Sequence, residues 1–335
     1  MVAGRHVSHD KEELVNLQIL RGIAAMLVVT NHFLSTTIGG VFKLNGGLGV
    51  DIFFVLSGFL MIHTMNEKKS SVSFLLSRVK RIYPLYLILS IPLILSTIPL
   101  TYTFGIVGNL LLIPSFGDPN YTMANGPSWT LVYEMMFYLM FSACLIFTKN
   151  KSLICLVICI VISLCVYSIN GYDRYRWVNF GYIIGDPLML NFAAGCAIAC
   201  LYEHTKLFKI NTILSLLIFI ILMRLALVDL EGQERIYKFG IPSVFIILIA
   251  IHTRFNSSVL TSALRELGDA SYSIYLSHIY VTLIFHSMKD LNRDWNVIIY
   301  SSIALCLVSP IFGIFIYRTI EKPITIYLRN RKQPV

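Results

Sequence analysis

Apolar runs of about 20 residues recur along the whole chain, and they constrain its fold more than any other feature. A run of this length crosses a bilayer as a helix, which satisfies every backbone group internally. The runs lie at 17–37, 48–66, 82–100, 128–148, 152–169, 186–202, 210–228, 237–253, 272–288 and 297–318. They are continuous rather than alternating, which argues against a transmembrane β-barrel. The sequence therefore predicts an all-α, polytopic transmembrane bundle of about ten spans, with the shorter run 104–113 re-entrant or interfacial.

Composition argues against a soluble enzyme and explains the charge without nucleic acid. The chain is 56% hydrophobic and 13% charged, whereas about a quarter of the residues of a soluble domain are charged. Basic cytoplasmic loops account for the formal charge of +9. All seven cysteines fall in apolar runs, with no spacing typical of a disulfide framework or a metal site. We therefore expect neither a metal nor a nucleic-acid partner.

The distribution of Lys and Arg predicts the orientation of the bundle. With the N-terminus inside, the inner segments hold 18 of the 27 Lys and Arg residues, and the outer loop 101–127 holds none. This bias predicts that both termini are cytoplasmic. We expect a cytoplasmic segment at 1–16, a membrane domain at 17–320 and a basic cytoplasmic tail at 321–335. The first span is too long and too polar for a signal peptide, so we expect it to remain as an uncleaved anchor.

The first span carries two residues that are costly inside a membrane, Arg21 and His32. They are eleven residues apart, about 16 Å along a helix and close to one face. The rise of a helix places His32 roughly 22 Å above the inner face, in the same outer layer as Asp51, Glu134 and Arg224. A carboxylate beside an imidazole raises its basicity, which suits a general base or a nucleophile. His32, Asp51 and Glu134 are therefore the candidate catalytic residues.

Each of these candidates also has a structural interpretation. His32 could simply bridge two helices through hydrogen bonds. Asp51 follows a glycine-rich turn and could cap the second helix. Glu134 could pair with Arg224, and the nearby Trp129 and Tyr133 could belong to the aromatic belt.

A second group of charged residues gathers at the inner face. Arg78 and Arg81 are three residues apart and share a helix face, and Arg21 opens the first span on the same side. Together with Arg318 and Lys322 they could bind a polyphosphate such as that of coenzyme A. Positive-inside topology and contact with anionic lipid are the alternative explanation, which we prefer for the lysines, whereas the fixed spacing of Arg78 and Arg81 favours phosphate binding. Helical rise places His278 roughly 9 Å deep, and Glu321 ends the last span. Both are expected nearer this inner cluster than the layer of His32, as structural or donor-side residues.

Six segments in order resemble one family. They are Arg21 followed by His32 eleven positions later, GVDIFFVLSGFLM at 49–61, RVKRIYPLY at 78–86, PSWTLVYEMMFY at 127–138, SYSIYLSH at 271–278 and IEKP at 320–323. This arrangement resembles the integral-membrane acyltransferases (acyltransferase type 3) that modify cell-surface polysaccharides. It is particularly similar to bacterial exopolysaccharide and O-antigen O-acetyltransferases.

The resemblance implies ten helices in the bacterial inner membrane, acetyl-CoA as a cytoplasmic acyl donor and a glycan hydroxyl as acceptor. It assigns the essential histidine to His32, the paired arginine to Arg21, and the donor-binding basic pair to Arg78 and Arg81. Because the sequence ends shortly after its last span, we expect it to lack the additional soluble domain of some relatives. The expected activity therefore rests on the membrane unit, alone or with a partner.

The sequence thus predicts a membrane O-acyltransferase that acts on a surface polysaccharide or its lipid-linked precursor. His32 would either remove the proton of a sugar hydroxyl or carry the acyl group itself. A transporter or flippase for a lipid-linked sugar or an acyl group could use the same charges as a relay, although paired broken helices in two halves are not visible. A structural partner of a glycan synthase is the third interpretation.

Overall fold

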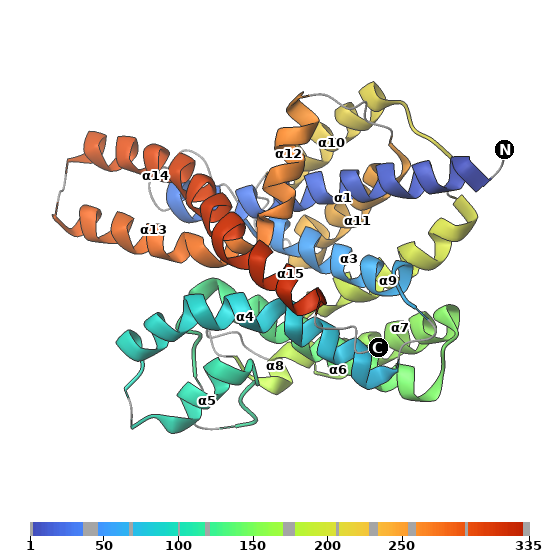
Figure 1. Cartoon of the computed structure of the whole chain (residues 1–335), viewed down its shortest axis with the longest axis horizontal. Coiled ribbons are helices and arrows are strands. Elements are labelled where there is room, and N and C mark those ends of the chain that lie inside the picture. Colours follow the sequence, from blue (N-terminus) through green and yellow to red (C-terminus); the bar gives the residue numbers. More distant parts are fainter. Residues whose placement is uncertain are drawn as a thin grey trace. The chain divides into compact units, whose positions relative to one another are not determined.

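The computed structural model describes residues 3–35, 46–66, 70–99, 101–117, 121–169, 178–205, 208–227, 234–253, 259–291 and 294–330, and this part of the chain is built from helices (Figure 1). The helices are α1 (Ala3–Thr30), η1 (Asn31–Ser35), α3 (Gly47–His63), α4 (Ser71–Thr97), α5 (Thr103–Leu111), η2 (Gly126–Ser128), α6 (Trp129–Phe147), α7 (Lys151–Ile169), α8 (Phe180–Gly185), α9 (Met189–Thr205), α10 (Thr212–Leu227), η3 (Ile236–Gly240), α11 (Ile241–His252), α12 (Val259–Asp269), α13 (Ser271–Leu291), α14 (Trp295–Ile316), η4 (Tyr317–Glu321) and α15 (Lys322–Asn330).

Several of these helices can cross a membrane. Five helical stretches of the described chain are long and apolar enough: Val15–Leu34, Ser71–Thr97, Gly126–Phe147, Lys151–Ile169 and Trp295–Asn330. Shorter apolar helices occupy Gly47–His63, Thr212–Ala226 and Ile236–His252. The predicted all-α membrane fold is therefore confirmed. Every predicted run overlaps a helix, while the number of crossings and the side of the termini stay predictions.

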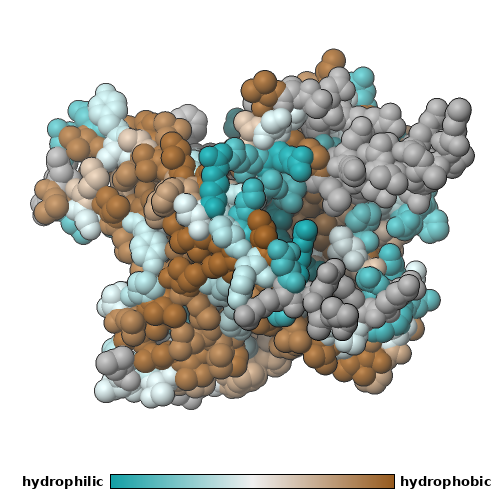
Figure 2. Space-filling view, in the orientation of Figure 1, coloured by the Kyte–Doolittle hydropathy of each residue, from teal (hydrophilic) through white to brown (hydrophobic). Residues whose placement is uncertain are grey.

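Large apolar side chains cover the outer surfaces of several helices, as a lipid environment requires. On α7 the exposed residues include Leu153, Leu156, Ile160 and Leu164. On α14 they include Tyr300, Leu307, Ile311 and Phe315, and Figure 2 shows brown, apolar surface over α13 and α14. Such broad apolar surface on a water-soluble monomer would be unusual. It is the expected exterior of a helix bundle in a bilayer.

The chain divides into two compact units. The first consists of Met1–Leu56 and Leu201–Phe315, and the second of Ser57–Cys200 and Ile316–Val335. In the first unit, α1 packs against α11, α12 and α13. Gly268 of α12 lies so close to α1 that a Cβ atom there would be 1.9 Å from the carbonyl oxygen of Gln18. The helix that carries Arg21 and leads into the turn with His32 is thus held from several sides.

Two amphipathic helices lie in segments where the sequence predicts no span. The connection 254–271 contains α12, and the expected tail 321–335 is helical over Lys322–Asn330 as α15. Both have a polar face, so neither reaches the hydropathy of a spanning run. In the second unit α15 packs against α4, which carries Arg78 and Arg81.

Helix α4 corrects the predicted start of the third span. It begins at Ser71 rather than at residue 82, with the side chain of Ser70 accepting a hydrogen bond from the backbone N–H of Ser73. The sequence prediction stopped at the basic residues because they interrupt the apolar run, but a helix can carry them on one face. Arg78 and Arg81 therefore lie inside α4, about 10 and 15 Å from its first residue.

Helix α5 forms where the short apolar run was expected to be re-entrant or interfacial. Its Asn109 is fully buried and donates to the carbonyl oxygens of Gly105 (2.9 Å) and Thr122 (3.0 Å). The Tyr86 hydroxyl of α4 donates to the Asn109 carbonyl, which fixes α5 to the bundle. In the same segment Tyr121 donates to the carbonyl of Ile113. Burial raises the pKa of Tyr121 above its usual value, so this phenol remains a donor.

Candidate functional site

His32 lies where α1 changes from an α-helix to a π-helical turn. Residues Asn31–Ser35 form this turn, η1, directly after Thr30. Single π-turns within helices are rare and frequently occur at functional sites. The side chain of His32 is half-buried, whereas the adjacent Phe33 is fully buried. The predicted candidate therefore lies at a local change of helix geometry with its imidazole partly accessible.

The imidazole of His32 meets a second imidazole, that of His278. His32 Nδ1 and His278 Nε2 are 2.7 Å apart, a hydrogen bond between side chains 246 residues apart in sequence. The ring centroids are 4.9 Å apart and the ring planes differ by 12°. His278 lies in α13 and has no exposed surface. The first unit thus contains a histidine pair with one buried and one partly accessible ring.

This contact corrects the predicted place of His278. The sequence estimate put His278 with the inner basic cluster, because it assumed that its span starts at the membrane surface. In the structure α13 starts at Ser271 directly after α12, and Ala270 and Ser271 are both fully buried. A helix that starts inside the protein has no depth that can be counted from the membrane surface. His278 consequently lies beside His32.

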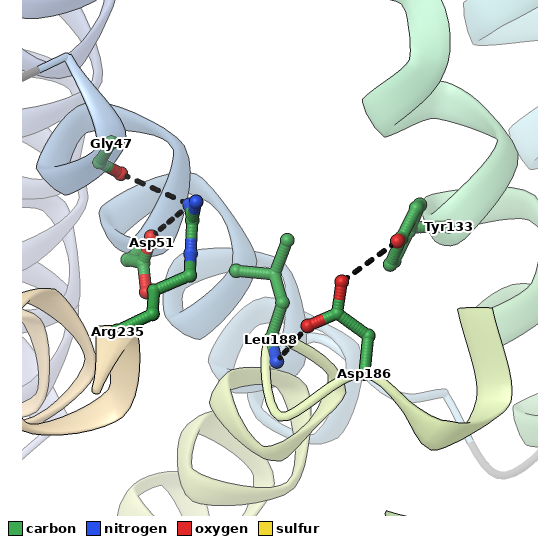
Figure 3. Close-up of polar contacts among 6 residues, drawn as sticks. All are labelled: Gly47, Asp51, Tyr133, Asp186, Leu188 and Arg235. Atoms are coloured by element: carbon green, nitrogen blue, oxygen red, sulfur yellow. Dashed lines mark hydrogen bonds and ion pairs between the residues drawn. The ribbon is translucent and has the colours of Figure 1, made fainter. Parts of the chain in front are cut away.

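Asp51 forms an ion pair that the sequence analysis missed. Its carboxylate is 1% exposed, and Asp51 Oδ2 accepts a hydrogen bond from Arg235 Nη2 at 2.5 Å (Figure 3). The same guanidinium nitrogen lies 3.5 Å from the carbonyl oxygen of Gly47. Because α3 begins at Gly47, Asp51 lies one turn inside it, and the capping interpretation is wrong. Arg235 directly precedes η3, so the pair joins α3 to η3.

Glu134 belongs to a polar group in the second unit. Glu134 Oε1 accepts hydrogen bonds from Ser57 Oγ at 3.3 Å and from the Tyr138 hydroxyl. The guanidinium of Arg78 lies over the ring of Tyr138, 5.7 Å from its centroid, and within electrostatic range of Glu134. The sequence estimate placed Glu134 and Arg78 near opposite faces of the membrane, and this separation is wrong. Seven residues of α4 precede Arg78 and raise it toward Glu134.

The remaining basic candidates differ in exposure. Arg78 also lies over the ring of Phe74, at 5.1 Å, and is half-buried, whereas Arg81 is exposed one turn later. In the first unit Arg21 is half-buried, and its Nη1 lies 3.4 Å from Gln18 Oε1. Arg224 is exposed in the last turn of α10.

The π-turn η4 contains Arg318 and Glu321 and packs against α4 in the second unit. Glu321 therefore lies on an element that contacts the helix of the basic pair, as the sequence predicts. The described residues contain no group of three His, Cys, Asp or Glu side chains placed to bind a metal ion.

One further buried carboxylate was absent from the predicted site. Asp186 is 4% exposed; its Oδ2 accepts from the Tyr133 hydroxyl at 2.8 Å and its Oδ1 from the backbone N–H of Leu188 at 2.9 Å (Figure 3). Trp129 meets Tyr133 edge to face, with centroids 5.3 Å apart. Asp186 thereby anchors the start of α9 to α6. The Asp-Pro pair that opens the sixth run is the local signal that could have identified it.

Comparisons with known proteins agree with the sequence motifs. A family model described as an acyltransferase domain matches residues 14–318. The exopolysaccharide production protein ExoZ of Rhizobium meliloti is 25% identical over 310 residues, which cover 83% of this chain and 89% of ExoZ. The O-acetyltransferase OatA of Staphylococcus aureus is 28% identical over 356 residues, covering 93% of this chain but only 57% of OatA. No solved structure matches the chain.

Proposed function

The chain belongs to the acyltransferase family whose model matches residues 14–318, and we propose that it moves an acetyl group from acetyl-CoA to a sugar hydroxyl of a surface polysaccharide or its lipid-linked precursor. Membership of the family makes it an acyltransferase of the membrane. The likeness to ExoZ and OatA supports the choice of acetyl and of a polysaccharide acceptor. The bacterial inner membrane is the corresponding location, with the acyl donor in the cytoplasm.

The observation that carries the proposal is the partly accessible imidazole of His32, hydrogen-bonded to a buried second imidazole. An imidazole so oriented can accept the proton of a hydroxyl as that oxygen attacks a thioester. It can equally accept the acyl group before passing it on. Both routes use the same residue, and the second would carry an acyl group between the two sides of the membrane.

The donor is assigned to the basic pair of α4. Arg81 is exposed, and Arg78 is held by two aromatic rings. Guanidinium groups bind phosphate through paired hydrogen bonds, and their spacing of one turn suits a diphosphate. Glu134 lies close enough to balance part of the charge of Arg78. We therefore give Glu134 a role in holding Arg78, and we assign Arg21 to donor binding on the basis of the family motif.

The decisive experiment uses purified protein in lipid vesicles with acetyl-CoA labelled in the acetyl group. Wild-type protein should release free coenzyme A and transfer label to an added glycan acceptor. His32→Ala should reduce transfer by about 10²- to 10⁴-fold, the usual contribution of a general base. His204→Ala, at an exposed position near the end of α9, is the matched control. Uptake of labelled donor into the vesicles without thioester cleavage would contradict the acyltransferase proposal and favour a transporter.

A further inference from the structure

The hydrogen bond between His32 and His278 restricts where the two rings carry their hydrogens. It joins His32 Nδ1 to His278 Nε2 at 2.7 Å. One nitrogen must donate and the other must accept, because two N–H groups facing one another cannot bond. If His32 donates, its Nε2 holds the lone pair and can react. If His278 donates, a neutral His32 carries its hydrogen on Nε2 and cannot act as a base.

The surroundings of His278 decide between the two arrangements. Its second nitrogen, Nδ1, is buried, and the carbonyl oxygens of Ile274 and Tyr275 lie one helical turn before it along α13. Within the described chain it makes no hydrogen bond of good geometry. Carbonyl oxygens are acceptors, so a hydrogen on Nδ1 is favourable there and a lone pair is not. His278 therefore carries its hydrogen on Nδ1 and offers the lone pair of Nε2 to His32.

We propose that His278 is a positioning residue that fixes the Nδ1–H form of His32 and so makes Nε2 the nitrogen that reacts. The inference rests on the proposed transferase function. In the transfer step the acceptor O–H gives its proton to His32 Nε2 while its oxygen bonds to the acyl carbon, and the C–S bond breaks to release a thiolate. The second hydrogen of the His32 imidazolium remains shared with His278 Nε2.

Packing holds His278 in this orientation. The ring of Tyr275 lies beside it, with centroids 6.0 Å apart, and Thr282 Oγ1 donates to its carbonyl oxygen at 2.9 Å. Gly313 of α14 lies so close to α13 that a Cβ atom there would be 2.4 Å from Ile274. His286, two turns further along α13, is exposed and near enough to His32 to interact with it electrostatically. Because of this interaction His286 is unsuitable as a control, and the exposed His204 near the end of α9 takes that place.

The tautomer of His32 can be measured without any substrate. Protein labelled with ¹⁵N-histidine in lipid gives separate signals for protonated and unprotonated ring nitrogens. We expect His32, identified by the signals lost in His32→Ala, to show protonated Nδ1 and unprotonated Nε2. His278→Leu should give a mixture of both forms, and His278→Gln, whose amide oxygen can replace Nε2 as acceptor, should restore the first. A His32 protonated on Nε2 in the wild type would overturn the proposal.

Kinetics provide the second test. His278→Leu should lower kcat about a hundredfold and leave the KM for the acyl donor unchanged, since the base is misoriented rather than the donor lost. His278→Gln should lie within about tenfold of wild type, and the control His204→Ala should match wild type. An unchanged kcat in His278→Leu would sink the inference while leaving the transferase function standing. Absence of transfer by the wild type would contradict the proposed transferase function. The tautomer measurement would still test whether His278 fixes the Nδ1–H form of His32.

Discussion

At the scale of single residues, the two arginines of α4 differ in their surroundings. Arg78 is half-buried between the rings of Phe74 and Tyr138 and close to Glu134, whereas Arg81 is exposed. A guanidinium stacked on aromatic rings has a fixed direction, and an ammonium group cannot reproduce this geometry. In the proposed donor site, Arg78 therefore fixes the direction of its hydrogen bonds to the donor phosphate, whereas Arg81 contributes mainly its positive charge.

This difference predicts unequal effects of substitution. Arg78→Ala with Arg81→Ala should weaken donor binding by about tenfold to a hundredfold, the loss of one or two charge-assisted contacts, and leave acceptor binding nearly unchanged. Arg78→Lys should remain defective, whereas Arg81→Lys should be largely active. Titration of the protein with a fluorescent coenzyme A analogue measures the donor affinity. Lys80→Ala, at an exposed position of the same helix, is the control. A donor affinity in the double variant equal to that of the wild type would show that the two arginines serve membrane topology rather than donor binding.

The Asp51–Arg235 pair predicts an asymmetric loss of stability. Asp51 is 1% exposed and Arg235 28% exposed. Arg235→Ala leaves a buried carboxylate without its cation, whereas Asp51→Ala leaves a cation that can reach water. We therefore expect Arg235→Ala to destabilise by about 2–4 kcal/mol and Asp51→Ala by about 1–2 kcal/mol. Thermal unfolding in detergent measures both, and the double variant, which leaves no buried charge without its partner, should be less destabilised than Arg235→Ala and so less than the sum of the single losses.

A further variant, Asp51→Asn, tests the catalytic assignment of Asp51. The observed ion pair favours a structural role, so Asp51→Asn should keep most of the wild-type kcat below its unfolding temperature. A large fall in kcat in folded protein would instead show that Asp51 acts on His32.

At the scale of elements, ionisable residues accompany the π-helical turns. His32 lies in η1, Lys238 in η3 directly after Arg235, and Arg318 and Glu321 in η4. A π-turn widens the helix locally and changes the direction of the side chains that follow. The regular spacing of 3.6 residues used in sequence reasoning cannot describe such turns. They therefore mark where helical projection from the sequence is least accurate.

The packing of α3 against α9 gives a prediction for Gly58. A Cβ atom at Gly58 would lie 2.1 Å from the carbonyl oxygen of Phe192, which is backbone and cannot turn aside. Gly58→Ala should therefore separate these segments and destabilise the protein by about 1–3 kcal/mol, as overpacking does. Fluorescence-detected size exclusion after heating measures the loss. Gly117→Ala, where a Cβ meets nothing within 4 Å, should be neutral, and equal stability of the two variants would contradict the packing argument.

At the scale of the whole molecule, the orientation of the chain remains to be measured. The excess of Lys and Arg on the inner side predicts cytoplasmic termini. A C-terminal green fluorescent protein fusion should therefore fluoresce, and a C-terminal alkaline phosphatase fusion should be inactive. Fusions at a position in the loop 101–127 should behave in the opposite way. Active phosphatase at the C-terminus would contradict the predicted cytoplasmic side of that terminus.

Much of the architecture could be predicted because hydropathy is a local property. Each predicted run overlaps a helix, and His32 and Glu134 could be identified as costly residues within these runs. The partners could not be predicted in this way. His278 lies 246 residues from His32, and Arg235 lies 184 residues from Asp51. Such contacts depend on which helices pack side by side, and neither helical rise nor residue spacing predicts this.

The burial of Asp51 beside Arg235 has a practical consequence for handling the protein. Mobile ions screen charges in water over about 8 Å at physiological ionic strength, but they reach a buried carboxylate poorly. Concentrated salt should therefore leave α3 attached to η3, while an anion held at the exposed Arg81 would dissociate. A high-salt wash can accordingly strip a phosphate-bearing ligand carried through purification and still return folded protein.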